Sequence, residues 1–360
     1  MDSLNELLAL PPFSLPQREK ARRLAERLAQ LTAFHCQACP PYRRMVEAQG
    51  KEAVAPQSSE QIPFIPASLF KHMDLLSVPP EQIVKTLTSS GTQGQRVSTI
   101  YLDRETAIAQ QRSLVNIVSD FIGRARLPLL IIDSPDVLTN RRLFSARGAG
   151  ILGFSLFGRD RTFALTPQMM PDWQAIDAFL RRHHGRPVLL FGFTFILWRH
   201  FYQPLLQRKQ RVDLSCATLI HGGGWKKLSE AAVSAEAFSD ALRQLCGLSR
   251  IHDYYGMVEQ TGSLYLQCAS GHLHASLCSD IIMRRHQDFS PCETGEPGLI
   301  QVVSALPRSY PGHSLLTEDR GVILGIDDCP CGRKGNYFRV LGRVKDAEIR
   351  GCSDTYAAAF

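Results

Sequence analysis

The spacing of apolar residues along the chain separates helical from strand-like segments. Residues 17–35 repeat apolar side chains every three or four positions, with the basic residues largely on the opposite side, which predicts an amphipathic packing helix. Further on, short apolar runs alternate with segments of helical periodicity. They predict strands over 127–133, 188–191, 217–220 and 251–254, and helices over 103–120, 173–182 and 227–245. Strands separated by helices are typical of an α/β fold with a largely parallel sheet.

The pattern changes at Gly262, where short apolar runs separated by prolines and glycines begin. This texture predicts an antiparallel sheet or a small barrel. We therefore expect an N-terminal helical segment packed on the core (1–60), an α/β core (60–262), a short-stranded β region (263–342) and a tail (343–360).

Composition and charge narrow the class of protein. The chain has 360 residues, of which 44% are hydrophobic and 21% charged, enough to bury a sizeable core. Its net charge of +7 is spread along the chain without a long block of like charges, which does not favour nucleic-acid binding. The longest strongly apolar stretch, 187–198, is too short to span a bilayer, and the N-terminus lacks a signal-peptide pattern. We expect a cytoplasmic protein whose ten cysteines serve metal or thiol chemistry before a disulfide framework.

A hydroxyl- and glycine-rich segment over 85–98 has the composition of a polyphosphate-binding loop. Gly91 and Gly94 permit unusual backbone dihedrals, the hydroxyls add donors, and Arg96 supplies a positive charge. It is not a Walker A loop, because Gly94 is followed by Gln and Arg and not by Lys and Ser or Thr. Such clusters are also common in surface turns, so the case for a nucleotide depends on the segments downstream.

Four downstream segments complete a series. His221-Gly-Gly-Gly-Trp-Lys-Lys follows a predicted strand, and its glycines would let a flat ring lie against the backbone. The segment 253–262 follows another strand and offers two tyrosines for stacking, two glycines and two carboxylates. The segment 316–321 adds a carboxylate that could hold ribose hydroxyls, and 341–346 adds two cations suited to a phosphate.

In this order the five segments resemble the acyl-adenylate-forming enzymes. More narrowly, Phe70-Lys71, the glycine turn at 221–227 and the closing Arg350-Gly-Cys-Ser resemble the LuxE-type acyl-protein synthetase family, which is related to phenylacetate-CoA ligases. The resemblance implies a large adenylate-forming domain with parallel-rich sheets and a small antiparallel or barrel-like region. It also implies that the mobile C-terminal lid domain is missing, since fifteen residues follow Lys345.

The resemblance also implies ATP and Mg²⁺ as cofactors and assigns roles to single residues. The β- and γ-phosphates would lie at Thr88, Ser89, Ser90, Gly91, Thr92 and Gly94. Adenine would be framed by Gly222, Gly223, Gly224, Tyr254 and Tyr255, and Asp253 and Gly256 would also contact ATP. Glu259 would bind Mg²⁺, Asp319 would hold the ribose, and Arg343 and Lys345 would contribute catalytic cations.

The same resemblance makes Cys352 the acceptor of the acyl group. A thiolate is a good acyl acceptor, and the neighbouring Arg350 and Lys345 would favour the thiolate form. Cys352 would take the acyl group from acyl-AMP as a thioester, with release of AMP, and pass it to a partner resembling an acyl-CoA reductase or an acyltransferase. An exposed tail cysteine without a role is the alternative.

Two further groups of residues suggest a metal and a substrate. Cys268, His274, Cys329 and Cys331 are soft ligands suited to a structural Zn²⁺, and the segment around Cys329 resembles one that binds zinc in phenylacetate-CoA ligases. Buried thiols are the alternative reading, with His272 and Cys278 as spare ligands. The apolar run 189–198 could line an acyl tunnel through its aromatic residues, or form ordinary core; these residues are Phe191, Phe193, Phe195 and Trp198.

Three functions remain open on the sequence. The first is an ATP-dependent synthetase that activates a carboxylic acid, by family resemblance a fatty acid, and acylates its own cysteine. The second is an acid:CoA or acid:carrier-protein ligase of the phenylacetate-CoA ligase type. The third is a non-catalytic, zinc-stabilised scaffold subunit, which would show no pyrophosphate exchange with any acid.

Overall fold

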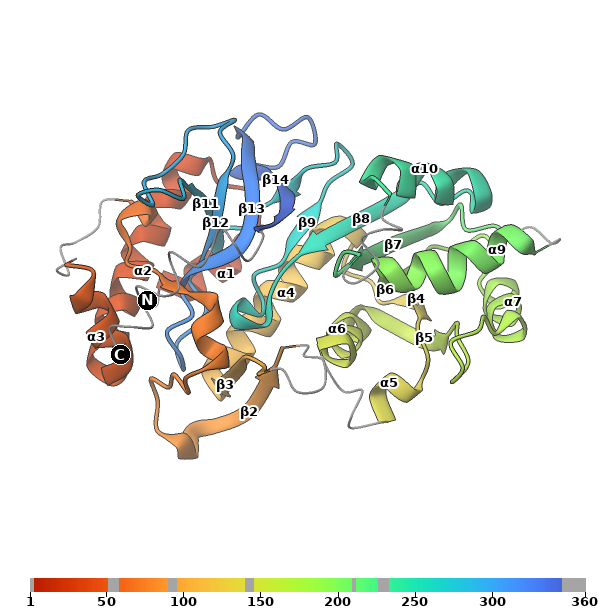
Figure 1. Cartoon of the computed structure of the whole chain (residues 1–360). Coiled ribbons are helices and arrows are strands. Elements are labelled where there is room, and N and C mark those ends of the chain that lie inside the picture. The colour runs from red at the N-terminus through yellow and green to blue at the C-terminus, as the bar shows by residue number, and fades with distance from the viewer. Residues whose placement is uncertain are drawn as a thin grey trace. The chain divides into compact units, whose positions relative to one another are not determined.

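The computed structural model describes residues 3–50, 58–89, 96–139, 146–208, 212–225 and 233–344. The chain divides into two compact units (Figure 1). Unit 1 comprises residues 1–120 and 256–360, and unit 2 comprises residues 121–255. Residues 60–120, which the sequence analysis grouped with the rest of the α/β core, therefore belong to unit 1.

Unit 2 is built on a parallel sheet of strand order β5-β4-β6-β7-β8. The predicted strands are confirmed, each lying within one or two residues of its expected bounds, and β5 is added. The strands are β4 (Leu127–Ile132), β5 (Gly158–Phe163), β6 (Val188–Phe193), β7 (Ala217–Gly222) and β8 (Arg250–Tyr255).

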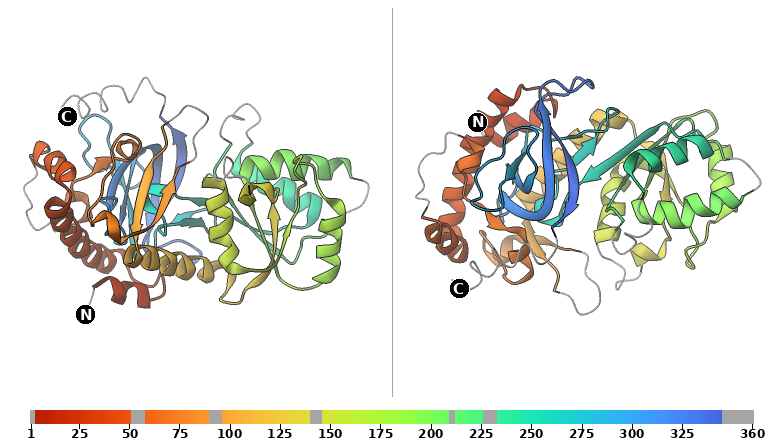
Figure 2. Two further views of the ribbon diagram at one scale, coloured as in Figure 1. Left: turned by 90° about the horizontal axis from the view of Figure 1, so that it is seen from below. Right: turned by 45° about the horizontal axis from the view of Figure 1, so that its top comes forward.

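Helices cover both faces of this sheet (Figures 1 and 2). On one face, α7, α9 and α10 bury their apolar sides against alternate residues of β4, β6 and β7, and α6 packs against β6 from the other face through Phe154 and Phe191. The helices are α5 (Asp136–Thr139), α6 (Ala146–Phe154), α7 (Trp173–Arg182), α8 (Thr194–Ile196), α9 (Gln203–Gln207) and α10 (Ala235–Cys246), with a π-helical turn at Leu197–Tyr202.

Within the described residues, the helix expected over 227–245 is α10, which begins at Ala235. Ser234 caps α10, since its side chain accepts a hydrogen bond from the Ala237 N–H at 3.1 Å. The helix ends where Gly247 takes a positive φ of 73°. Residues 226–232 lie outside the described residues, so the earlier part of the predicted helix is not tested.

Unit 1 contains the antiparallel strands that the change of pattern at Gly262 predicts. Their order is β11-β12-β13-β14-β10-β9, and β1 joins β13 in parallel. A separate hairpin pairs β2 with β3. The strands are β1 (Ile65–Pro66), β2 (Ile83–Thr88), β3 (Thr99–Asp103), β9 (Tyr265–Gln267), β10 (Leu273–His274), β11 (Ser279–Arg284), β12 (Gly298–Ser304), β13 (Ser314–Ile326) and β14 (Asn336–Arg343).

The helices of unit 1 are α1 (Ser3–Ala9), α2 (Gln17–Ala38), α3 (Pro40–Ala48) and α4 (Arg104–Ile122), the last extending just into unit 2. The amphipathic helix predicted over 17–35 is α2, and Leu24 and Leu28 pack in a core that also contains residues of α1, β11 and β12. Asp103 caps α4 as predicted, because its carboxylate accepts from the Thr106 N–H at 2.8 Å. Among the described helices, none combines the length and apolar character that crossing a membrane requires.

Candidate active site

The glycine turn and the tyrosine pair lie at the carboxyl ends of adjacent strands in unit 2. His221 and Gly222 of β7 are the register partners of Asp253 and Tyr254 of β8. Ligands of open parallel sheets lie at this edge. A Cβ added to Gly222 would stand 2.6 Å from the Tyr254 ring, so only glycine fits beneath that ring.

The turn itself needs glycine at the next two positions. Gly223 and Gly224 have φ of 81° and 58°, in the left-handed region that other residues rarely adopt. Directly after them, Trp225 packs edge-on against Trp198, with ring centroids 5.7 Å apart. Of the three glycines, Gly222 lies against the Tyr254 ring, whereas a Cβ on Gly223 would meet Phe193 at 2.9 Å.

In unit 1 the predicted phosphate loop is the connection of the β2–β3 hairpin. Thr88 pairs with Thr99 in the ladder. Beyond them, the Ser89 N–H donates to the Ser98 carbonyl at 3.0 Å and the Ser98 N–H donates to Ser89 Oγ at 2.9 Å. These bonds close the base of the loop. Ser90, Gly91, Thr92 and Gly94 lie outside the described residues, as do Lys345 and Cys352.

Glu259 is a buried carboxylate in a short helical turn of unit 1. Its side chain is 7% exposed, and its backbone carbonyl accepts from the Tyr310 hydroxyl at 2.9 Å. Burial raises the pKa of Glu259, and the positive charges of Lys71 and Arg343 act in the opposite direction. The sequence analysis quoted Lys71 only as part of a motif; its place near Glu259 is a tertiary feature.

Asp319 and Arg343 are cross-strand partners on β13 and β14 of unit 1. Arg343 Nε lies 3.5 Å from Asp319 Oδ1, and the two side chains are 72% and 22% exposed, respectively. An ion pair with so exposed an arginine contributes little to stability. The structure thus brings together the carboxylate predicted for ribose and the cation predicted for phosphate.

The four predicted metal ligands converge in unit 1, although 63 positions separate the first from the last. One ligand atom from each of Cys268, His274, Cys329 and Cys331 lies within 4.8 Å of all the others. Cys268 Sγ is 3.8 Å from Cys329 Sγ, and His274 Nε2 is 3.3 Å from Cys331 Sγ. Two sulfurs bound tetrahedrally to one Zn²⁺ at about 2.3 Å would be roughly 3.8 Å apart, so the cluster fits this ion.

The two spare ligands differ in position. His272 Nδ1 lies 3.3 Å from Cys329 Sγ, at the side of the cluster. Cys278 instead packs among the apolar residues of α1 and α2, and burial raises the pKa of its thiol to about 12. Cys278 is therefore a core residue and not a ligand of this cluster.

The aromatic run predicted to line an acyl tunnel is divided between two faces of the unit 2 sheet. Phe191 stacks on Phe154 at 4.3 Å and lies edge-on to Phe193 at 5.7 Å. Trp198 instead stacks on Tyr202 at 4.3 Å and packs against the core on the opposite face. Phe195 lies between them in α8 and is partly buried. Trp198 is thus not brought together with Phe191 and Phe193.

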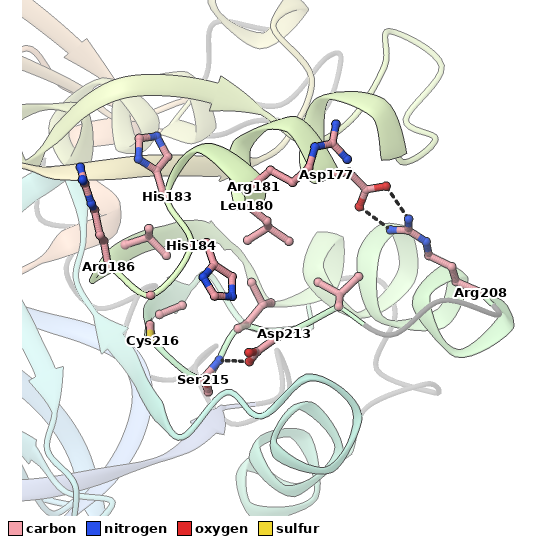
Figure 3. Close-up of a pocket in the computed structure, with 15 residues that line it drawn as sticks. Asp177, Leu180, Arg181, His183, His184, Arg186, Arg208, Asp213, Ser215 and Cys216 are labelled. Carbon is pink, nitrogen blue, oxygen red and sulfur yellow. Dashed lines mark hydrogen bonds and ion pairs between the residues drawn. The ribbon is translucent and has the colours of Figure 1, made fainter.

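A pocket of about 280 Å³ opens at the amino ends of β6 and β7 in unit 2 (Figure 3). Arg181, His184 and Arg186 line it, and the Arg208–Asp177 ion pair, with contacts of 2.6 and 3.0 Å, lies at one side. The pocket is at the opposite end of the strands from the glycine turn. None of the residues predicted to bind ATP or the acyl group lines it.

Comparison with solved structures defines the class of fold. The chain is similar to 2-hydroxyisobutyryl-CoA ligase solved in the postadenylation state with 2-HIB-AMP, with a TM-score of 0.69 and 17% identity over 92% of this chain and 69% of that one. An open conformation of the same ligase with 2-HIB-AMP and CoA gives a TM-score of 0.69 at 17% identity, covering 93% and 77%. The fold is therefore that of the acyl-adenylate-forming ligases.

Sequence comparison gives the family. The family model described as acyl-protein synthetase, LuxE, matches residues 3–360. The chain is 22% identical over 357 residues to a long-chain-fatty-acid–luciferin-component ligase of Vibrio harveyi, covering 95% of this chain and 89% of that protein. It is 23% identical over 318 residues to the ligase of the same name from Aliivibrio fischeri, covering 82% and 77%. The chain belongs to the LuxE acyl-protein synthetase family and is an ATP-dependent, acyl-adenylate-forming ligase.

Proposed function

We propose that this ligase activates a long-chain fatty acid with ATP and transfers the acyl group to its own Cys352. The observation that supports the nucleotide site best is the pairing of the glycine turn with Tyr254 at the carboxyl ends of β7 and β8. The fatty acid is inferred from the names of the two related ligases. The acceptor is inferred from the family and from the short distance in sequence between Arg343 and Cys352.

The proposed reaction has two steps. A carboxylate oxygen of the acid attacks the α-phosphorus of ATP, the bond from that phosphorus to the bridging oxygen breaks, and pyrophosphate leaves. The thiolate of Cys352 then attacks the acyl carbonyl carbon, the bond from that carbon to the AMP oxygen breaks, and AMP leaves with the electron pair. The thiol proton is lost to solvent when the thiolate forms.

The residues of unit 1 would compensate charge in the first step, which brings two anions together. Asp319 would hold the ribose hydroxyls and Arg343 a phosphate oxygen. Glu259 offers the hard oxygen ligand that Mg²⁺ prefers, so a buried carboxylate at this position fits that ion. When bound, Mg²⁺ would neutralise part of the polyphosphate charge. Lys71 would add a positive charge that acts on Glu259.

The experiment that tests this function is intact-protein mass spectrometry after incubation with ATP, Mg²⁺ and a panel of fatty acids, without CoA. We expect an added acyl mass that hydroxylamine removes and that is absent from Cys352→Ser. The matched control is Cys216→Ser, which removes an exposed cysteine and should leave the adduct unchanged. An adduct that persists in Cys352→Ser would place the acceptor elsewhere.

A second outcome would change the class of acceptor. If the protein carries no adduct while acyl-AMP accumulates in solution, the enzyme activates acids for an external thiol such as CoA or a carrier protein. If the thioester forms, its consumer is a partner of the acyl-CoA-reductase or acyltransferase kind. Chase of the labelled protein with such a partner would then move the label from Cys352.

We also propose that Cys268, His274, Cys329 and Cys331 hold a structural Zn²⁺. The distances within the cluster support tetrahedral ligation, and the ion would tie β10 to the loop that contains the two later cysteines. Elemental analysis of the purified protein should find one zinc per chain, lost in Cys329→Ser but kept in Cys278→Ser. Absence of zinc, with a melting temperature unchanged by chelator, would remove this assignment.

A further inference from the structure

Two polar residues that the reaction does not use lie beside the glycine turn in unit 2. Thr194 directly follows β6, and His221 precedes Gly222 at the end of β7. Because Gly192 pairs with His221 and Phe193 with Gly222, Thr194 lies next to both residues. Thr194 is 6% exposed and His221 is 5% exposed, so their hydrogen bonds must be made within the protein.

The distances define a chain of hydrogen bonds. Thr194 Oγ1 donates to the carbonyl oxygen of Gly222 at 3.2 Å. His221 Nδ1 lies 2.9 Å from the same Oγ1. The hydroxyl proton of Thr194 is already committed to the carbonyl, so Nδ1 must carry the proton and donate to Oγ1.

Asp253 is the nearest acidic neighbour of His221 on β8. Its Oδ1 lies 3.6 Å from His221 Nδ1, beyond hydrogen-bond distance, and burial raises the pKa of Asp253 to about 7. Burial lowers the pKa of His221 to about 3, so the ring is neutral and has a single N–H. The chain of hydrogen bonds therefore runs from His221 through Thr194 to the carbonyl of Gly222.

The carbonyl at the end of this chain is that of Gly222, at the start of the glycine turn. Glycines have no side chain to hold them in place, and Gly223 and Gly224 could adopt many other conformations. The Tyr254 ring limits Gly222 from one side, and the hydrogen bond from Thr194 fixes its carbonyl. The same chain links the end of β6 to the end of β7, the strand that contributes Gly222 to the proposed adenine-binding residues.

We propose that Thr194 and His221 are positioning residues for ATP, which hold the glycine turn in the conformation that receives the adenine ring. The inference rests on the proposed nucleotide site and adds two residues to it. Both act through the Gly222 backbone. Their loss should therefore weaken binding of ATP and AMP and leave the affinity for the carboxylic acid unchanged.

The test compares Thr194→Val, which removes the hydroxyl at nearly constant volume, with Thr194→Ser, which keeps it. Calorimetric titration with ATP and with AMP gives affinity, and ATP–pyrophosphate exchange gives KM for ATP and for the acid. The control is Thr218→Val, a buried threonine on the same strand as His221. It reports the cost of losing a buried hydroxyl away from the turn.

We expect Thr194→Val to weaken ATP and AMP binding roughly ten-fold, as for one lost buried hydrogen bond, with the KM for the acid unchanged. Thr194→Ser should restore affinity to within about two-fold. His221→Asn, whose amide N–H can replace Nδ1–H, should bind ATP more tightly than His221→Leu.

Three results would overturn the inference. One is wild-type ATP affinity in Thr194→Val. Another is an equal loss in Thr194→Val and Thr218→Val, which would indicate a purely structural effect. The third is a parallel rise in KM for ATP and for the acid. A wild-type protein that neither binds ATP nor exchanges pyrophosphate with any acid would instead overturn the proposed function, and this inference with it.

Discussion

A buried ion pair in unit 1 offers a quantitative test of how the N-terminal helix is held. Lys20 of α2 and Asp280 of β11 are each 1% exposed, and Lys20 Nζ lies 3.3 Å from Asp280 Oδ1. The carboxylate also accepts from Gln17 Nε2 at 2.6 Å, from Asn336 Nδ2 at 2.9 Å and from the Ile281 N–H at 2.9 Å. Burial lowers the pKa of Lys20, and Asp280 opposes this effect.

Because of these contacts, we expect substitution of Lys20 and of Asp280 to cost different amounts of stability. Lys20→Met removes the ammonium but leaves Asp280 with three N–H donors, so we expect unit 1 to lose about 2 kcal/mol of unfolding free energy. Asp280→Asn removes the carboxylate that pairs with Lys20 and places an N–H₂ group among three N–H donors. We expect this variant to lose about 3–5 kcal/mol of unfolding free energy. The double variant should lose less than the sum of the two, because it no longer buries an unpaired charge.

The assay can follow the two units separately. All three tryptophans of the chain belong to unit 2, at Trp173, Trp198 and Trp225, so tryptophan fluorescence in urea reports that unit. Hydrogen exchange of the 17–38 peptide, measured by mass spectrometry, reports the opening of α2. We expect faster exchange in the single variants with an unchanged tryptophan midpoint. Additivity of the two losses to within about 0.5 kcal/mol would refute the coupling.

Two further predictions concern buried groups in each unit. His35 and His313 stack at 5.0 Å in unit 1; burial lowers the pKa of His35 to about 3 and that of His313 well below its usual value. Each imidazole binds a proton near pH 6.5 in the unfolded chain but stays neutral in the folded one. The free energy of unfolding is therefore highest above pH 6.5 and falls by about 2 kcal/mol for each histidine between pH 7 and pH 5. Urea titrations of His313→Gln, monitored by exchange of the 17–38 peptide, should show a correspondingly shallower pH dependence, and an unchanged dependence would contradict this account. In unit 2, Gly222→Ala should lower the tryptophan midpoint and ATP affinity because its Cβ meets the Tyr254 ring; adding Tyr254→Ala should restore the midpoint without restoring affinity, and a neutral Gly222→Ala would count against the close contact.

The elements themselves were largely determined by local sequence. Apolar periodicity predicted α7 with the bounds 173–182 that the structure has, and it predicted α2 to within three residues at its end. Asp103 marked the start of α4 because a short polar side chain can satisfy a free N–H three residues later. Order along the chain also led to the proposed nucleotide-binding segments, two of which place glycine or tyrosine at the ends of β7 and β8.

What packs against each element was decided only by the tertiary structure. Periodicity shows which face of α2 is buried, but it does not show that Lys20 meets Asp280 or that the His35 ring meets Ser77 Oγ at 2.7 Å. The same limit applies to the aromatic run at 189–198, whose alternation on β6 sends neighbouring side chains to opposite faces. It applies as well to the convergence of Cys268 with Cys329, and of Thr194 with His221. Polar groups are buried only where a partner from elsewhere in the chain satisfies them, so these partners become known when the fold brings distant residues together.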